Sequence, residues 1–202
     1  MRVALASAGL FFMAIHPSAK AADFRRGEDR LGVAAPRLEL HRWLHSPPLE
    51  IDALRGKVVM IRWWTEGCPY CVATAPSLRE LDRKYGPRGL QVIGIFHPKP
   101  AGDWSVTRMQ NASARLGINF PVALDGDWTA LRRWWPDLEK RGWTSVSFVV
   151  DKAGIIRYVH PGGEFHERRG GDDPEHAQCE REYANIEQVI QRLLAEKLAP
   201  KL

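Results

Sequence analysis

The chain has 202 residues, 45% of them hydrophobic and 26% charged, which is enough for one domain with a sizeable core. Its 29 basic and 24 acidic residues give a net charge of +5 and are interspersed along the chain, so we expect no nucleic-acid-binding surface. Three cysteines are too few for a disulfide scaffold, and the hydrophobic core must therefore stabilise the fold.

The first residues have the pattern of a secretory signal peptide. Met1-Arg2 is followed by an apolar run over 3–15 and then by Ala19-Lys20-Ala21, the order of a charged region, a hydrophobic region and a cleavage site. The apolar run is shorter than the roughly 20 residues of a membrane-spanning helix, so a retained anchor is the weaker alternative. We predict a signal peptide over 1–21, a flexible lead-in over 22–36, a folded domain over 37–202 and a periplasmic location.

Predicted strands alternate with predicted helices in the rest of the chain. The apolar run Lys57–Trp64 is typical of a strand covered on both faces, and Pro69–Tyr85 has helical spacing, with Pro76 expected to kink the helix. The other predicted elements are strands at 37–43, 90–96 and 120–124, helices at 105–116 and 129–135, a hairpin of 147–150 with 155–160, and a last helix around 186–194.

This order predicts an α/β fold with a central mixed sheet, parallel in its first part and antiparallel in its last, flanked by helices. The polar segment 161–182 is longer than most connections in a compact domain. We therefore expect this segment to be a functional or a disordered loop.

Cys68-Pro69-Tyr70-Cys71 lies where the strand 57–64 is expected to run into a helix. The backbone N–H groups at a helix start favour a thiolate, so we predict Cys68 as the nucleophile and Cys71 as the resolving cysteine. Pro69 suits the first helical position, and Tyr70 is expected at the rim of the site. An inert disulfide would close too small a loop to stabilise much, and a metal clip would need a second pair of ligands.

The stretch "LRGKVVMIRWWTEGCPYCVATAPSLRELDRKYGPRGLQVIGI" resembles the thioredoxin superfamily, in particular exported TlpA/ResA-like thiol–disulfide oxidoreductases. The stretches "LGINFPVALDGD" and "FVVDKAGIIRYVHPGGEF" are similar to the thioredoxin-like domain of DipZ-type proteins. The resemblance implies a thioredoxin fold and dithiol exchange without a cofactor. It also implies exported protein thiols or disulfides and a membrane redox protein as partners.

The sequence departs from this family at the loop that faces the cysteines and aligns substrate chains. Ser145 stands where family members usually carry a cis-proline, with Val146 after it. A cis bond before a residue other than proline costs roughly 3 kcal/mol, so we expect a trans backbone in this loop. Gly67 also replaces a common tryptophan, which leaves Trp63 and Trp64 either as substitute cover for the site or as core residues.

Arg62 is the second departure, because thioredoxins carry a buried acid six residues before the first cysteine. On a strand Arg62 shares a face with Met60 and Trp64, which places the guanidinium near the cysteine helix. There it would favour the Cys68 thiolate and make the disulfide more oxidising. The alternative is that an acid such as Glu66 or Asp151 neutralises Arg62.

Several weaker candidates lie outside the cysteine pair. His176-x-x-Cys179, with His166 nearby, has a spacing that can hold a metal or serve a third redox thiol. Histidines are common in solvated loops, so we assign no metal ligands. His97 and His160 could relay protons or form local hydrogen bonds. Thr65-x-x-Cys68 is also found in thiol peroxidases, but these have a proline where Ile61 stands.

Overall fold

The computed structural model describes residues 23–167 and 174–197. The predicted signal peptide, 1–21, lies outside these ranges. Strand β2 (Val58–Trp64) is the centre of a six-stranded sheet, and all seven of its residues are buried. It pairs in parallel with β3 (Leu90–Phe96) and antiparallel with β5 (Ser147–Val150). Apolar side chains on both faces are what such a central position requires.

The strand order is β1-β4-β3-β2-β5-β6, with β1 (Trp43–Leu44), β4 (Val122–Leu124) and β6 (Ile156–His160) completing the sheet. Strands β2, β3 and β4 are parallel, whereas β1, β5 and β6 run antiparallel to their neighbours. The predicted mixed sheet is therefore confirmed, including the antiparallel hairpin of β5 and β6.

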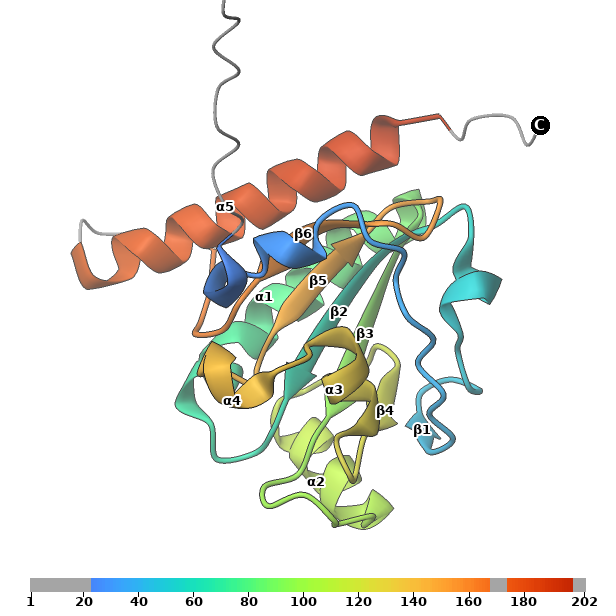
Figure 1. The fold of residues 1–202 in the computed structure, drawn as a ribbon, viewed down its shortest axis with the longest axis vertical. Coiled ribbons are helices and arrows are strands. Elements are labelled where there is room, and N and C mark those ends of the chain that lie inside the picture. Colours follow the sequence, from blue (N-terminus) through green and yellow to red (C-terminus); the bar gives the residue numbers. More distant parts are fainter. Residues whose placement is uncertain (1–22, 168–173, 198–202) are drawn as a thin grey trace, which may run out of the picture.

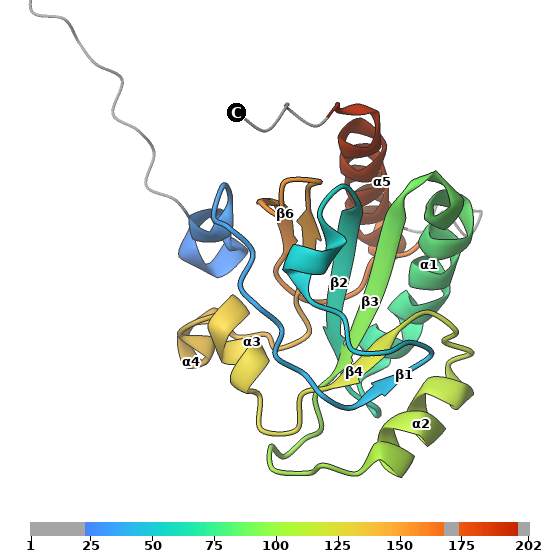
Figure 2. The same cartoon turned by 90° about the vertical axis from the view of Figure 1, so that its right-hand side faces the viewer.

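Helices cover both faces of the sheet (Figures 1 and 2). One face carries α1 (Pro69–Tyr85), α2 (Val106–Arg115) and α5 (Pro174–Ala195), whose apolar residues share a core with Met60 and Trp64. The other face carries α3 (Thr129–Trp134) and α4 (Leu138–Arg141), and α3 packs there with Ile61 and Trp63. The short 3-10 helices are η1 (Phe24–Arg26), η2 (Glu28–Arg30), η3 (Ile51–Leu54) and η4 (Gly86–Arg88). In the described part of the chain, no helix has the length and apolar character to cross a membrane.

Some boundaries differ from those predicted. The strand expected at 37–43 is only the two-residue β1, because Glu39 and His45 have positive φ angles that interrupt extended backbone. The last part of the polar segment 161–182 belongs to α5, which begins at Pro174. Tyr183 is buried and adds one turn to the apolar stripe formed by Ile186 and Ile190.

The N-terminal segment is attached to the domain by Arg141. Its guanidinium lies between the rings of Phe24 and Trp135, at 3.8 and 3.9 Å from the ring centroids, and pairs with Asp29 at 2.7 Å. The Arg141 side chain is fully buried. These contacts favour an ordered segment, whereas composition alone predicted a flexible lead-in over 22–36, because the anchoring residue lies more than 100 positions further along the chain.

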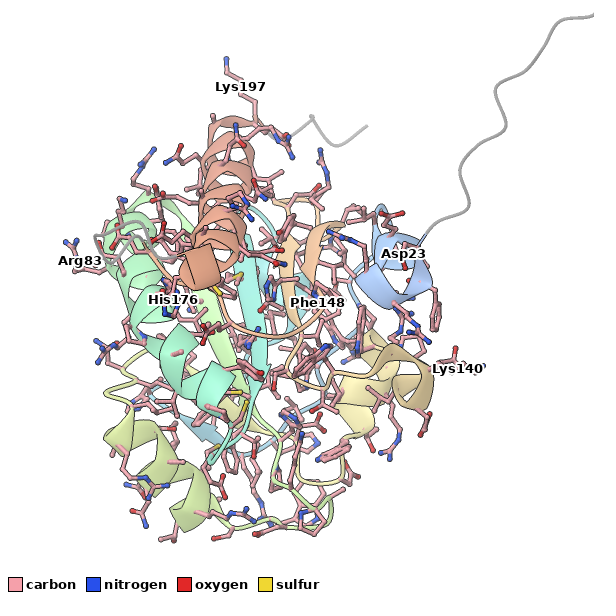
Figure 3. The ribbon with its side chains drawn as sticks, turned by 90° about the vertical axis from the view of Figure 1, so that its left-hand side faces the viewer. Asp23, Arg83, Lys140, Phe148, His176 and Lys197 are labelled. Atoms are coloured by element: carbon pink, nitrogen blue, oxygen red, sulfur yellow. The ribbon has the colours of Figure 1, made fainter. Side chains whose placement is uncertain are left out.

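We expect Arg141→Met to lower the free energy of unfolding by about 2 kcal/mol, because it removes two cation–π contacts and an ion pair. It should also expose the segment around Phe24 to proteolysis. Urea denaturation and limited proteolysis measure these two effects. Lys140→Met is the matched control, since Lys140 is the preceding residue of α4 and its side chain is exposed (Figure 3). Equal effects of the two substitutions would contradict the anchoring role.

Candidate active site

Cys68 caps the start of α1, directly after the turn that leaves β2. Gly67 has φ +73°, a left-handed conformation that glycine adopts without strain, and Cys68 returns to extended backbone at the N-cap. The Cys68 Sγ accepts a hydrogen bond from the Cys71 N–H at 3.4 Å, and Pro69 occupies the first helical turn. Cys68 is partly exposed, so its sulfur is accessible where the helix dipole favours negative charge.

Cys71 lies one turn into α1 and is only 3% exposed. Its Sγ is 3.2 Å from the Ser145 Oγ, and the Cys68 Sγ is 4.0 Å from the same oxygen. Both thiols are free. The arrangement is an accessible sulfur above a shielded one, with one hydroxyl serving both.

Ser145 brings a hydrogen-bond donor to the position where related proteins usually have a proline ring. Among the described residues the one cis peptide bond is Lys99–Pro100, so the bond before Ser145 is trans, as expected. The carbonyl of Val146 accepts a hydrogen bond from the Trp63 N–H at 3.0 Å, and its side chain is buried in the core. The loop is thereby fixed to the end of β2.

Arg62 is fully buried on the same side of β2 as the cysteines. It donates hydrogen bonds to the Ser147 Oγ at 3.1 Å and to the Gly163 carbonyl at 2.7 Å, and its guanidinium lies 5.5 Å from the Phe165 ring centroid. The two acids proposed to neutralise it are engaged elsewhere. Glu66 pairs with Arg108, and Asp151 pairs with Arg157 at 2.9 Å.

The charge of Arg62 therefore acts on the thiols. The pKa of Cys71 is lowered to about 5, first by a hydrogen bond from the Cys68 thiol and, against the opposing effect of burial, by Arg62 and Ser145. The same hydrogen bond and burial raise the pKa of Cys68. The two sulfurs titrate as one unit that holds a single negative charge at neutral pH. This differs from the expectation that the thiolate belongs to Cys68 alone.

Two exposed aromatic rings lie beside the cysteines. Tyr70 is 41% exposed, as its predicted place at the rim requires, and Trp143 is 44% exposed. Their ring centroids are 5.4 Å apart in an edge-to-face arrangement. Trp143 was missed in the sequence, because only the fold brings it next to Tyr70.

The remaining aromatic and histidine candidates are buried. Trp63 and Trp64 lie in the two cores on opposite faces of the sheet, so they are core residues rather than cover for the site. Burial lowers the pKa of His97 and of His160 to about 3, which leaves both rings neutral near pH 7. His97 bonds to the Thr144 hydroxyl at 2.9 Å and so helps to position the Ser145 loop.

Asp125 is a buried acid that sequence reasoning did not select. It accepts hydrogen bonds from the Trp63 indole and from the Ala130 and Leu131 N–H groups at the start of α3. Burial raises its pKa. These contacts give Asp125 a structural role on the face of the sheet opposite to Arg62.

A mixed sheet of this topology, with a Cys-x-x-Cys pair where its central strand meets the next helix, defines a thioredoxin-like fold with a candidate redox pair. The family model described as Redoxin matches residues 30–174. The chain therefore belongs to the Redoxin family.

Similar proteins agree with this class. Protein DipZ from Mycobacterium bovis is 31% identical over 131 residues, which are 63% of this chain and 18% of DipZ. Thiol-disulfide oxidoreductase ResA from Bacillus thuringiensis is 27% identical over 127 residues, 63% of this chain and 67% of ResA. A Chlorobium tepidum structure described as a thiol:disulfide interchange protein DsbE has a TM-score of 0.61 at 21% identity, covering 82% of this chain and 98% of that one. The chain spans less than a fifth of the length of DipZ.

The lowered pKa predicts a pH dependence of the reduced protein. In the folded state the first thiol proton is lost near pH 5, whereas an unfolded thiol keeps its proton up to about pH 8.5. The unfolded chain thus binds more protons between these values, and the reduced form gains stability relative to the oxidised form as pH rises through this window. The gain is lost as pH falls through 5. Above about pH 8.5 it declines again, since folded Cys68 retains its proton.

Denaturation of the reduced and of the oxidised protein across this pH range measures the difference between their free energies of unfolding. The contributions of the other titrating groups are common to both forms and cancel in this difference. Ultraviolet absorbance of the thiolate gives the pKa directly. A first thiol pKa near that of a free thiol would contradict the prediction.

We expect Arg62→Met to raise the first thiol pKa by about 1 to 2 units, because it removes the positive charge that helps to lower the pKa of Cys71. Methionine fills a similar volume, so the fold should persist. The redox potential should become more reducing, because the reduced form loses stabilisation of its thiolate. Arg108→Met is the control, since Arg108 contacts Glu66 rather than the cysteines. If the thiol pKa shifted equally in both variants, the effect would come from the net charge of the protein and not from the position of Arg62.

Proposed function

We propose that this protein exchanges dithiols and disulfides with exported proteins in the periplasm, through Cys68 and Cys71. The observation that carries the proposal is the pairing of an accessible sulfur at a helix start with a shielded sulfur that shares one negative charge with it. Attack requires access, and Cys68 is the more accessible of the two. Resolution requires proximity and a stabilised thiolate, which Arg62 and Ser145 supply to Cys71.

The exchange proceeds in two balanced steps. The proton moves along the Cys68–Cys71 hydrogen bond, and the Cys68 thiolate attacks one sulfur of a substrate disulfide, forming a mixed disulfide and releasing the other sulfur as a thiolate. Cys71 then passes this proton to the released substrate thiolate, attacks the Cys68 sulfur as a thiolate and releases the second substrate sulfur as a thiolate, which takes a proton from solvent. The substrate gains two electrons, and Cys68 and Cys71 become a disulfide. The reverse sequence oxidises a substrate dithiol, and neither direction needs a further cofactor.

The exposed rings of Tyr70 and Trp143 form an apolar rim next to Cys68. Such a rim suits a polypeptide substrate, whose apolar side chains can pack on aromatic faces while its cysteine reaches Cys68. The Ser145 hydroxyl lies 4.0 Å from the Cys68 sulfur and 3.2 Å from the Cys71 sulfur, so a substrate whose cysteine reaches Cys68 would pass close to it. We propose Tyr70 and Ser145 as substrate-facing residues and Arg62 as the residue that tunes the potential.

The signal pattern over 1–21 supports export, and an oxidising compartment supplies proteins whose thiols pair. Sustained turnover then needs a membrane redox protein that returns the Cys68–Cys71 pair to its starting state. A buried charge that favours the reduced form supports a more oxidising disulfide than the same site without Arg62 would have.

The alternative function, metal delivery by Cys68 and Cys71, has less support. Within the described residues, the one group of three or more possible metal-binding side chains does not include either cysteine. Peroxidase activity is the other alternative, and peroxide consumption by the reduced protein tests it.

Cys71→Ser should accumulate mixed disulfides between Cys68 and partner proteins in the exporting cell, because the resolving thiol is gone. Disulfide reductase turnover of purified protein should fall by at least about a hundredfold. Trapped partners are separated on non-reducing gels and identified by mass spectrometry. Cys68→Ser should trap nothing, and Cys179→Ser should accumulate no more mixed disulfide than the unmodified chain does, because it retains Cys71 as the resolving thiol. If neither Cys71→Ser nor Cys68→Ser traps a mixed disulfide, the proposal of exchange through this pair is wrong.

A further inference from the structure

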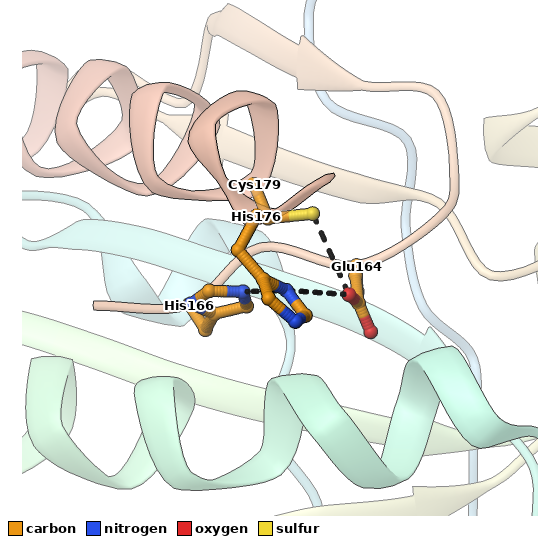
Figure 4. A group of neighbouring side chains, drawn as sticks. All are labelled: Glu164, His166, His176 and Cys179. Atoms are coloured by element: carbon orange, nitrogen blue, oxygen red, sulfur yellow. Dashed lines mark hydrogen bonds and ion pairs between the residues drawn. The ribbon is translucent and has the colours of Figure 1, made fainter. Parts of the chain in front are cut away.

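A second group of chemically active side chains, which does not include Cys68 or Cys71, is formed by the segment after β6 and the start of α5 (Figure 4). Glu164 and His166 belong to the segment after β6, and His176 and Cys179 lie three residues apart on α5. One donor atom from each residue lies within 4.8 Å of those of the other three. Residues three apart on a helix share a face, which explains why His176 and Cys179 point to the same place.

The spacing of this group approaches that of a tetrahedral metal site. Zinc bonds of about 2.0–2.1 Å to nitrogen or oxygen and 2.3 Å to sulfur place neighbouring donors roughly 3.3–3.6 Å apart. The observed separations are 3.1 Å from His166 Nε2 to His176 Nδ1, 3.5 Å from Cys179 Sγ to Glu164 Oε1, and 3.8 Å from His176 Nδ1 to Glu164 Oε1. The longest donor separation would contract by about 1 Å on binding.

His166 is oriented as a metal ligand by its own backbone. Its Nδ1 lies 3.0 Å from the Glu167 carbonyl, which can only accept, so Nδ1 carries the proton and Nε2 presents its lone pair to the cluster. Metal-binding histidines almost always donate their second ring N–H to such an acceptor. The ring is also 2% exposed, so this lone pair faces protein and not solvent.

We propose that Glu164, His166, His176 and Cys179 form a structural Zn²⁺ site. Binding displaces the proton of Cys179 to solvent and forms four bonds, from one thiolate, one carboxylate and two neutral imidazoles. The two negative ligands balance the two positive charges of the ion, so the partly buried complex is neutral. Four protein ligands leave no open position, which distinguishes this site from a catalytic one.

Zinc at this position would join the start of α5 to the segment that follows β6. The same segment supplies the Gly163 carbonyl and the Phe165 ring, both of which contact Arg62. The metal would therefore hold in place the segment whose carbonyl and ring contact Arg62, and Arg62 carries the charge that acts on Cys68 and Cys71.

The test uses the mature full-length chain carrying Cys68→Ser and Cys71→Ser, so that the dithiol cannot bind the probe. Zn²⁺ titration by calorimetry should give one ion per chain, and Zn²⁺ should raise the unfolding temperature. Co²⁺ in place of Zn²⁺ should give tetrahedral absorption bands with a thiolate charge-transfer band. His176→Ala and Cys179→Ser should each weaken Zn²⁺ binding at least tenfold, and Cys179→Ser should abolish the thiolate band.

His41→Ala is the matched control, because His41 is an exposed histidine outside the cluster, and it should leave binding unchanged. Glu164→Gln keeps the side-chain shape and serves as a second variant if another one fails to fold, judged by its unfolding temperature without metal. Absence of Zn²⁺ binding overturns the proposal. So does binding that folded His176→Ala, Cys179→Ser and Glu164→Gln variants retain unchanged.

Discussion

The active site depends on the placement of β2 in the middle of the sheet. Its backbone is hydrogen-bonded to β3 on one side and to β5 on the other, and both faces are covered, so its residues are fixed in all directions. The register places Arg62 beside Gly94 and Ser147. Gly94 leaves room for the Trp64 indole, which a Cβ would approach to 2.9 Å, and Ser147 supplies a hydrogen-bond acceptor for the guanidinium. Cys68 then begins α1 at a position that this rigid strand determines.

Arg62 connects this packing to redox chemistry. A buried charge loses its hydration at a cost of several kcal/mol unless nearby groups compensate it. Here compensation comes from one hydroxyl, one carbonyl and an aromatic ring, and the Nε atom is buried without a hydrogen-bond partner in the described structure. The negative charge that completes the balance is on the cysteine pair and exists only when the pair is reduced. Oxidation leaves Arg62 less well compensated, which is the physical reason to expect a more oxidising disulfide than the same site would have without Arg62.

The sequence predicts those parts of the fold and the site whose determinants are local. The buried run of β2, the helical spacing of α1 and the Cys-x-x-Cys pair between them are all visible in consecutive residues, and so is the face that Arg62 shares with Met60. The sequence does not specify the features that distant residues decide. The N-terminal segment is anchored by Arg141, and α5 begins at Pro174, earlier than predicted. The partners of Arg62 come from β5 and from the segment after β6, which no local pattern could specify.

The Cys68–Cys71 pair and Cys179 have different surroundings although they belong to one chain. Cys68 and Cys71 are adjacent, share a charge and lie at an accessible helix start, which suits turnover. The sulfur of Cys179 lies 3.5 Å from a carboxylate oxygen of Glu164. Burial, the hydrogen bond to Glu164 and the negative charge of Glu164 together raise the pKa of the Cys179 thiol. A protonated thiol is a poor nucleophile, so this environment protects an odd cysteine from unwanted disulfides. Coordination to a metal would achieve the same protection, and either way exchange is confined to the pair beside Arg62.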